Sequence, residues 1–148
     1  MENVHYTHKV AVVAYIVRGE KFLLLKRNTP PRIWAPPGGH LRRDENPIEG
    51  LKREIREETN LEIEVVAPVN TWFGEWNGYK LLSIDYLVRV TGGELRLSAE
   101  HTNSIWVSIA ELRAGKPVAL DPRLVFTLGD FENAKRLIDL LRSASYRI

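Results

Sequence analysis

Residues 38–61 read GGHLRRDENPIEGLKREIREETNL, a double glycine followed by the pattern of an amphipathic helix. Pro47 suits the first helical position. Apolar side chains then recur at the spacing of one helix face, at Ile48, Leu51 and Ile55. Asn60 follows the last turn, where a left-handed residue often ends a helix. The stretch therefore predicts a helix over residues 47–59 that begins after a glycine-containing loop.

Three glutamates share one face of this helix, at i, i+3 and i+4: Glu54, Glu57 and Glu58. Like charges at this spacing cost a few tenths of a kcal/mol, and the C-terminal end of a helix also disfavours anions. A hard divalent cation such as Mg²⁺ would offset both costs, because it prefers carboxylate oxygens. Arg53 could hold the Glu57 carboxylate four residues later, and the upstream glycines allow a close backbone approach. The alternative is an ordinary solvated helix face.

The remaining chain alternates strand and helix patterns. Strands are expected at Val10–Val17, Phe22–Lys26, Lys80–Val90 and Ser104–Val107, and Glu62–Phe73 is expected as one strand or as a pair broken at Pro68. Turns are expected at Arg18–Lys21, Asn77–Gly78 and Gly92–Gly93, and a proline-rich loop at Asn28–Pro37.

Two further helices follow. Ser108 could cap a short helix through Leu112, with Glu111 completing a capping box, and Asp130 could cap the last helix. The buried face of that helix is expected to be Phe131, Ala134, Leu137, Ile138 and Leu141. The order of elements predicts an α+β chain, a mixed sheet covered by helices, as a single domain over residues 1–148.

Composition narrows the function classes. The chain has 148 residues, no cysteine and a net charge of +2 with acids and bases interspersed. This excludes disulfides and thiolate metal sites, and we expect no strong nucleic-acid binding. The longest uncharged apolar run, Val10–Val17, is too short to span a membrane. Met1–Asn3 do not begin a signal peptide pattern, so a cytoplasmic location is expected.

The glycine loop and helix together resemble the Nudix box of the Nudix (MutT-like) hydrolases, over residues 39–61. The matching positions are Gly39, Glu45, Arg53, Glu54, Ile55, Glu57, Glu58 and Leu61. The preceding Trp34–His40 also looks like the family's approach to the box. Asn60 stands where the family has glycine. Asparagine is the next best residue for a left-handed turn, and no side-chain ligand is lost, so the metal site is expected to be intact.

The resemblance implies a mixed β-sheet sandwiched between helices, with the catalytic loop and helix after the second or third strand. It also implies hydrolysis of the diphosphate link in a nucleoside diphosphate derivative, by attack of water on phosphorus with Mg²⁺ (or Mn²⁺) as cofactor. The implied metal ligands are the Gly38 carbonyl, Glu54, Glu57 and Glu58, with Arg53 orienting Glu57 and with Gly39 and Glu45 in support. The general base would be a box glutamate or Glu100 from a later loop.

Substrate contacts are less specified, and each has a plain structural alternative. Arg27 could bind phosphate or end a strand in solvent, and Glu100 could be an exposed loop acid. Asp85 could bind a base edge or face solvent on a half-buried strand. The aromatic residues around the Asn77–Gly78 turn could stack on a base, pack within the hairpin or form a dimer contact: Trp72, Phe73, Trp76 and Tyr79.

The expected partner is a small nucleotide, and the short chain favours a nucleoside triphosphate or a modified nucleotide. ADP-ribose, nucleotide sugars and dinucleoside polyphosphates are alternatives. A non-catalytic Nudix-fold sensor is an alternative of another class, although such sensors commonly lose box acids that this chain retains. An unrelated mixed-sheet protein with an accidental match is the remaining alternative. Family resemblance also makes a homodimer possible.

Overall fold

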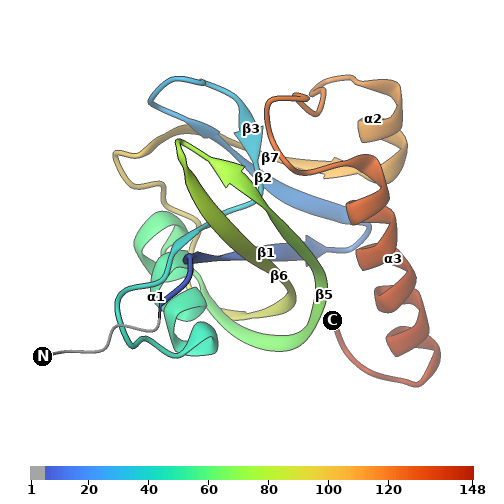
Figure 1. Cartoon of the computed structure of the whole chain (residues 1–148). Helices are drawn as coiled ribbons and strands as arrows, with labels where there is room; N and C mark the ends of the chain where they lie inside the picture. Colours follow the sequence, from blue (N-terminus) through green and yellow to red (C-terminus); the bar gives the residue numbers. More distant parts are fainter. Residues whose placement is uncertain (1–5) are drawn as a thin grey trace, which may run out of the picture.

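The computed structural model describes residues 6–148, which form seven strands and three helices (Figure 1). The strands are β1 (Lys9–Arg18), β2 (Lys21–Arg27), β3 (Trp34–Ala35), β4 (Gly38–His40), β5 (Glu62–Trp76), β6 (Tyr79–Gly92) and β7 (His101–Ser108). The helices are α1 (Pro47–Thr59), α2 (Ile109–Ala114) and α3 (Leu128–Ser143). The expectation that Met1–Asn3 do not begin a signal peptide concerns residues outside the described range.

The sheet is mixed and centres on β1. The strand order is β3-β2-β1-β6-β5, with β4 also paired to β1 and β7 to β2. β1 runs parallel to β6 and antiparallel to β2 and β4. Every side chain from Ala11 to Val17 is buried, as expected for a central strand covered on both faces.

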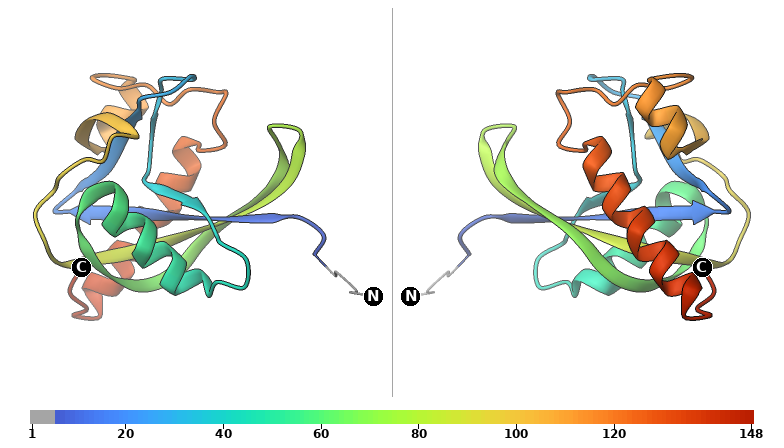
Figure 2. Two further views of the ribbon diagram at one scale, coloured as in Figure 1. Left: turned by 90° about the vertical axis from the view of Figure 1, so that its left-hand side faces the viewer. Right: turned by 90° about the vertical axis from the view of Figure 1, so that its right-hand side faces the viewer.

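Alternate residues of β1 enter two separate cores. Val12, Ala14 and Ile16 pack with Leu51 and Ile55 of α1. On the other face, the neighbouring residues pack with α3: Val13, Tyr15 and Val17 contact the cluster that holds Phe131, Ala134 and Ile138. Figures 1 and 2 show α1 and α3 on opposite sides of the sheet. The predicted mixed sheet sandwiched between helices is confirmed.

One loop prediction needs correction. The proline-rich segment contains the two-residue strand β3, and Gly38 and Gly39 belong to the short strand β4 rather than to a loop. The glycine segment therefore begins after the third strand, as the resemblance implied, and α1 follows β4. Strands of two and three residues are too short to show a period in the sequence. Of the two expectations for Glu62–Phe73, the single strand is confirmed: Pro68 does not break β5, which stays paired to β6 across three register shifts. β5 lies at the edge of the sheet, where a missing backbone N–H costs least.

The helix ends confirm most of the capping predictions. Asn60 ends α1 in the left-handed conformation (φ 64°), and Ser108 and Glu111 form the capping box of α2. The cap of α3 is Thr127, not Asp130 as predicted. Asp130 is the third helical residue, and its carboxylate accepts the Thr127 N–H in a reciprocal box. The sequence shows both polar residues but not which of them leaves helical geometry.

The predicted apolar faces of α1 and α3 are partly confirmed. Leu51 and Ile55 are fully buried, but Ile48 is 41% exposed. Ile48 lies on the same helix face as Leu51 and Ile55, but it is the second residue of α1, at the end of the helix that extends beyond the buried core. In α3, Phe131, Ala134 and Ile138 are buried, whereas Leu137 and Leu141 only border the core. Within residues 6–148, no helix is both long and apolar enough to cross a membrane.

Candidate active site

The site forms where the C-terminal half of α1 meets β4. The Gly38 N–H donates to a carboxylate oxygen of Glu58 at 3.1 Å. In an antiparallel ladder the N–H and C=O of one residue point the same way, so the Gly38 carbonyl also faces away from β1. A Cβ on Gly38 would lie 2.3 Å from the Val12 carbonyl oxygen, and one on Gly39 would lie 2.5 Å from the Glu54 carboxylate. Only glycines allow β4 to approach both β1 and α1 this closely.

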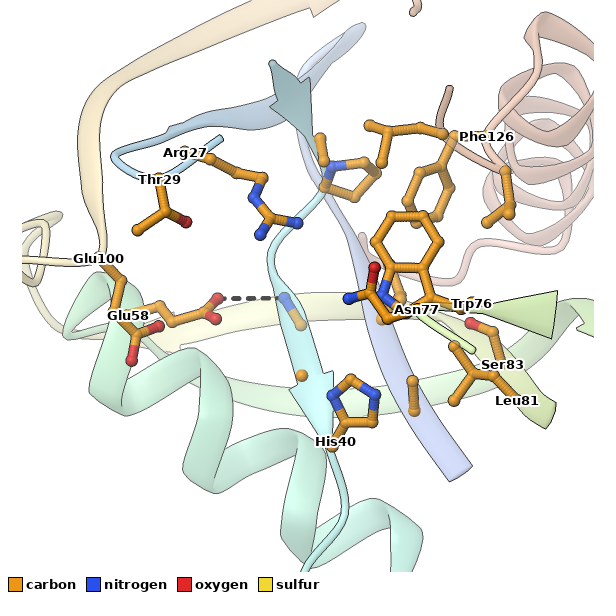
Figure 3. Close-up of a pocket in the computed structure, with 18 of the residues that line it drawn as sticks. Arg27, Thr29, His40, Glu58, Trp76, Asn77, Leu81, Ser83, Glu100 and Phe126 are labelled. Atoms are coloured by element: carbon orange, nitrogen blue, oxygen red, sulfur yellow. Dashed lines mark hydrogen bonds between the residues drawn. The ribbon is translucent and has the colours of Figure 1, made fainter. Parts of the chain in front are cut away.

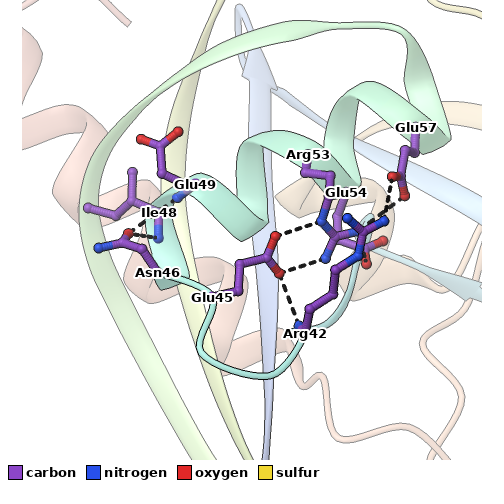
Figure 4. Close-up of polar contacts among 8 residues, drawn as sticks. All are labelled: Arg42, Glu45, Asn46, Ile48, Glu49, Arg53, Glu54 and Glu57. Atoms are coloured by element: carbon purple, nitrogen blue, oxygen red, sulfur yellow. Dashed lines mark hydrogen bonds and ion pairs between the residues drawn. The ribbon is translucent and has the colours of Figure 1, made fainter.

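Arg53 is the centre of a cluster of acids at the start of the site (Figure 4). Its guanidinium forms a bidentate pair with Glu45, at 2.7 and 2.8 Å. It also donates to Glu54 at 3.0 Å and to Glu57 at 3.2 Å. These bonds and the Arg42 backbone N–H hold the pKa of Glu45 down to about 2. Arg53 therefore fixes the loop to the helix through Glu45 and holds two of the helix glutamates, as the sequence suggested for Glu57.

The three helix glutamates differ sharply in exposure. The Glu57 side chain is 52% exposed, Glu54 is mostly buried, and Glu58 is only 4% exposed. Burial, with a further contribution from the Glu54 charge, raises the pKa of Glu58 to about 9. Burial also raises the pKa of Glu54, and Arg53 opposes that shift. The shared face predicted from sequence thus runs from solvent into the interior.

Glu100 and His101, from the segment that leads into β7, lie close to Glu58 of α1. Backbone bonds fix the segment that carries them. The N–H groups of Arg96 and Ser98 donate to the carbonyls of Thr59 and Glu58, and the Asn28 N–H donates to the Glu100 carbonyl. One ligand atom from each of Glu58, Glu100 and His101 lies within 4.8 Å of the other two. Glu100 is exposed and lies in the turn before β7, as the plain structural alternative expected, and it also lies beside Glu58.

A cavity of about 420 Å³ opens beside these groups (Figure 3). Glu58 and Glu100 lie side by side on one side of it, and Trp76 and Phe126 lie on the opposite side. The Arg27 guanidinium points into the space between them. Tyr79 also lines the cavity, and its hydroxyl lies 2.8 Å from Nε2 of His40. The arrangement offers acids and a cation at one end and aromatic rings at the other.

A second cavity of about 500 Å³ adjoins the first, and the two share Trp76, Leu124 and Val125. Trp72 and Asp85 line it. Asp85 is 4% exposed and accepts hydrogen bonds from the Tyr15 hydroxyl at 2.9 Å and the Ser83 hydroxyl at 3.0 Å. Burial raises its pKa to about 6. The alternative that Asp85 faces solvent is wrong, because β6 is covered on both faces at this position.

The structure brings most of the predicted site residues together around the two cavities. The predicted residues that line them are Arg27, Gly38, Gly39, Glu58, Trp72, Trp76, Tyr79, Asp85 and Glu100. Another four line neither cavity and form the cluster around the Arg53 guanidinium: Glu45, Arg53, Glu54 and Glu57. Phe73 also lies outside both cavities; it is 59% exposed, and its ring packs edge-on against His8. Successive strand residues face opposite sides, so Phe73 points away from its neighbour Trp72.

Sequence reasoning did not assign a site role to the loop residues Leu124–Phe126, and it gave His101 no chemical role. The loop residues are apolar and carry no local motif, so no sequence pattern marked them. The one available signal for His101 was its position directly after Glu100.

The residues present fit a divalent metal ion. In the described part of the chain Glu58 has no cationic partner, and the charges that affect it are those of Glu54, Glu57 and Glu100. A buried carboxylate among other carboxylates is costly without a cation. Nδ1 of His101 is also buried without a hydrogen-bond partner among residues 6–148. A metal ion would satisfy these groups together.

Comparisons with known proteins agree with this geometry. The family model described as NUDIX domain matches residues 7–127. The chain is 35% identical over 111 residues to "Putative 8-oxo-dGTP diphosphatase 2" of Mycobacterium tuberculosis, covering 71% of this chain and 77% of that protein. It is 33% identical over 97 residues to mouse bis(5'-nucleosyl)-tetraphosphatase [asymmetrical], covering 62% and 66%. The crystal structure of the MutT protein from Methanosarcina mazei Go1 superposes with a TM-score of 0.72 at 25% identity, covering 92% and 99%.

Proposed function

The chain belongs to the Nudix family and is a hydrolase of phosphorus-containing anhydrides, and we propose that it cleaves the diphosphate link of a nucleoside triphosphate or modified nucleotide with Mg²⁺ as cofactor. One observation carries the proposal. Glu58 is a buried carboxylate without a cation, beside Glu100 and at the edge of a cavity into which Arg27 projects. A cation next to the phosphates would stabilise the carboxylates and the substrate together.

The metal would be held by Glu54, Glu57 and Glu58 with the Gly38 carbonyl. When bound, it would offset the negative charge that develops on the phosphoryl oxygens and the leaving group. Arg53 keeps Glu54 and Glu57 in position through its hydrogen bonds. Glu45 holds Arg53 and the Arg42 backbone in turn.

The chemical step is attack of water on phosphorus. The water oxygen forms the new P–O bond, the bridging P–O bond of the diphosphate breaks, and the leaving phosphate receives a proton. A carboxylate accepts the proton of the attacking water, and both Glu100 and Glu58 border the cavity where this would happen. The Arg27 guanidinium, which is always charged, would balance the charge of a phosphate in the space between the acids and the aromatic rings.

The two adjoining cavities support a nucleoside as the rest of the substrate. Trp76 borders both, and Trp72 and Asp85 border the second, so a base could stack on indole and donate hydrogen bonds to a carboxylate. The relatives named above are called an 8-oxo-dGTP diphosphatase and a dinucleoside tetraphosphatase, and both names describe nucleotides. ADP-ribose, nucleotide sugars and dinucleoside polyphosphates stay alternatives. A cytoplasmic location and a homodimer stay predictions from the sequence.

The test is release of phosphate and nucleotide from a substrate panel with Mg²⁺, with Mn²⁺ and with EDTA. The panel holds dNTPs, oxidised dNTPs, ADP-ribose, a nucleotide sugar and diadenosine tetraphosphate. We expect metal-dependent cleavage of a nucleoside triphosphate. Glu58→Gln and Glu57→Gln should each lower the rate by at least about a hundredfold, because a carboxylate ligand is lost.

Glu49→Gln is the matched control, since Glu49 is an exposed acid in the first turn of the same helix. It should leave the rate unchanged. Full activity in Glu57→Gln would remove Glu57 from the metal set, and full activity in Glu58→Gln would refute the proposed site. Metal binding without cleavage of any substrate would favour a nucleotide sensor.

A further inference from the structure

His101 adds a nitrogen donor to the carboxylates of the site. It is the first residue of β7, and one of its ring nitrogens lies within 4.8 Å of carboxylate oxygens of both Glu58 and Glu100. The three side chains come from α1, from the segment after β6 and from β7. Backbone bonds already fix this segment to α1 and to the loop after β2. The donor atoms are therefore brought together by the fold before any ligand binds.

The imidazole of His101 lacks a partner that would explain its position. Its Nδ1 is buried without a hydrogen-bond partner among residues 6–148. Buried polar atoms have a hydrogen-bond partner in the great majority of cases, and a bound water or ion is one explanation of an exception. Glu58, itself 4% exposed, has only the Gly38 N–H and like charges around it. A buried carboxylate and a partly buried imidazole, both with spare electron pairs, thus lie close together beside Glu100.

His40 provides an internal comparison. It lines the same cavity, but its Nε2 lies 2.8 Å from the Tyr79 hydroxyl, and the two rings pack edge to face. Its ring already has a protein partner, and it is not part of the group formed by Glu58, Glu100 and His101. Of these two histidines, only His101 combines a buried unpaired nitrogen with nearby carboxylates.

We infer that Glu58, Glu100 and His101 form a mixed nitrogen–oxygen site that binds a first-row transition-metal ion in preference to Mg²⁺, so that Mn²⁺ rather than Mg²⁺ is the preferred ion of the two that the proposed function is tested with. Mg²⁺ favours oxygen ligands and keeps its waters, whereas divalent transition metals accept imidazole nitrogen readily. The inference rests on the proposed function, because Glu58 belongs to the metal set proposed there. It adds His101 as the residue that determines which ion the site prefers.

The test uses Mn²⁺ and the full-length, metal-free protein. Mn²⁺ stands at the weak end of the first-row series, so it is the strictest ion for this test. Electron spin-echo spectra of bound Mn²⁺ should show modulation from a coordinated ¹⁴N nucleus in the wild type and in His40→Gln. His101→Gln should lose that modulation. Its Kd for Mn²⁺ should rise roughly tenfold, while its Kd for Mg²⁺, measured by competition, should change less than about threefold.

Labelling the histidines of the wild type with ¹⁵N gives a second readout that needs no variant, because the modulation should change to that of ¹⁵N. Bound Mn²⁺ without nitrogen modulation in the wild type would overturn the inference and leave the proposed function standing. Modulation that persists in His101→Gln would also overturn it. A wild-type chain that binds neither Mn²⁺ nor Mg²⁺ would overturn both proposals.

Discussion

The acids around α1 divide into two groups that are held in opposite ways. Glu45, Glu54 and Glu57 all contact the Arg53 guanidinium, at distances of 2.7–3.2 Å. Glu58 and Glu100 face each other and His101, and in the described part of the chain Glu58 has no cationic partner. We call the first the Arg53 cluster and the second the Glu58 cluster.

The two clusters differ in how they affect the stability of the metal-free protein. A carboxylate with a permanent guanidinium partner is stable in the folded protein and holds the loop to the helix. A buried carboxylate without one destabilises the metal-free protein and is stabilised when a cation arrives. The two clusters share one helix, so opposite effects on stability are expected when each is disrupted.

Breaking the Arg53 cluster should have the largest effect on stability. Arg53→Met leaves Glu45 and Glu54, which are mostly buried, without their cation, so we expect a loss of about 2–3 kcal/mol in the free energy of unfolding. Urea denaturation with circular dichroism measures it. The control is Arg56→Met, because Arg56 forms an exposed, solvent-screened pair with Glu62, and its loss should change the free energy of unfolding far less. Equal costs for both variants would contradict a special role for the Arg53 cluster.

Removing the charge of Glu58 should act in the other direction. The pKa of Glu58 lies near 9 in the folded, metal-free chain, above its ordinary value of 4.5. The folded chain therefore holds a proton that the unfolded chain has released, and the free energy of unfolding falls as pH rises from about 4.5 to 9. Glu58→Gln should lack this pH-dependent fall. At pH 8 without metal, its free energy of unfolding should exceed that of the wild type by roughly 1 kcal/mol or more.

Urea denaturation from pH 5 to 9 in EDTA measures this effect, with Glu49→Gln as the control that should follow the wild type. A Glu58→Gln variant that is less stable than the wild type at pH 8 would mean that Glu58 has a favourable partner in the metal-free protein.

Asp85 permits the same comparison away from the metal site. Its pKa lies near 6 in the folded chain, above its ordinary value of 3.8, because it is buried. The folded chain binds the Asp85 proton more tightly than the unfolded chain does. The resulting stabilisation is fully present below about pH 4 and is lost as pH rises through 6. Asp85→Asn should remove roughly 1 kcal/mol of that pH-dependent loss. Thermal unfolding at pH 4, 5, 6 and 7 tests it, and a slope equal to that of the wild type would contradict the assignment.

The smallest effect is expected at the end of α1. Asn60 holds a left-handed conformation, and its side-chain amide donates to the Glu94 carbonyl at 3.0 Å. Asn60→Gly removes the strain of a left-handed conformation but also removes this hydrogen bond. The free energy of unfolding should therefore change by no more than about 0.5 kcal/mol, and activity should be unchanged. Asn60→Ala keeps the strain without the bond and should cost about 1 kcal/mol. A large loss of activity in Asn60→Gly would show that the Glu94 contact matters to the site.

The sequence of α1 by itself determined the helix, both of its ends and the identity of its acids. These follow from local rules: proline at the start, a left-handed asparagine at the end and the 3.6-residue period. The capping box of α2 and the strands β1, β2, β6 and β7 followed from equally local patterns. Helix ends, capping boxes and strand patterns can be predicted from the sequence because they depend on residues a few positions apart.

The tertiary structure decided which acid is buried and what it faces. Glu57 and Glu58 are neighbours with the same side chain, yet one is half exposed and the other is enclosed by β4 and the segment after β6. The position of β4 also depends on two glycines meeting β1 and α1. His101 and Asp85 reach the cavities through strand pairings between residues far apart in the chain. The Leu124–Phe126 loop reaches them because it packs on the core formed by β1 and α3. Burial and charge environment are properties of these long-range contacts, and no local pattern contains them.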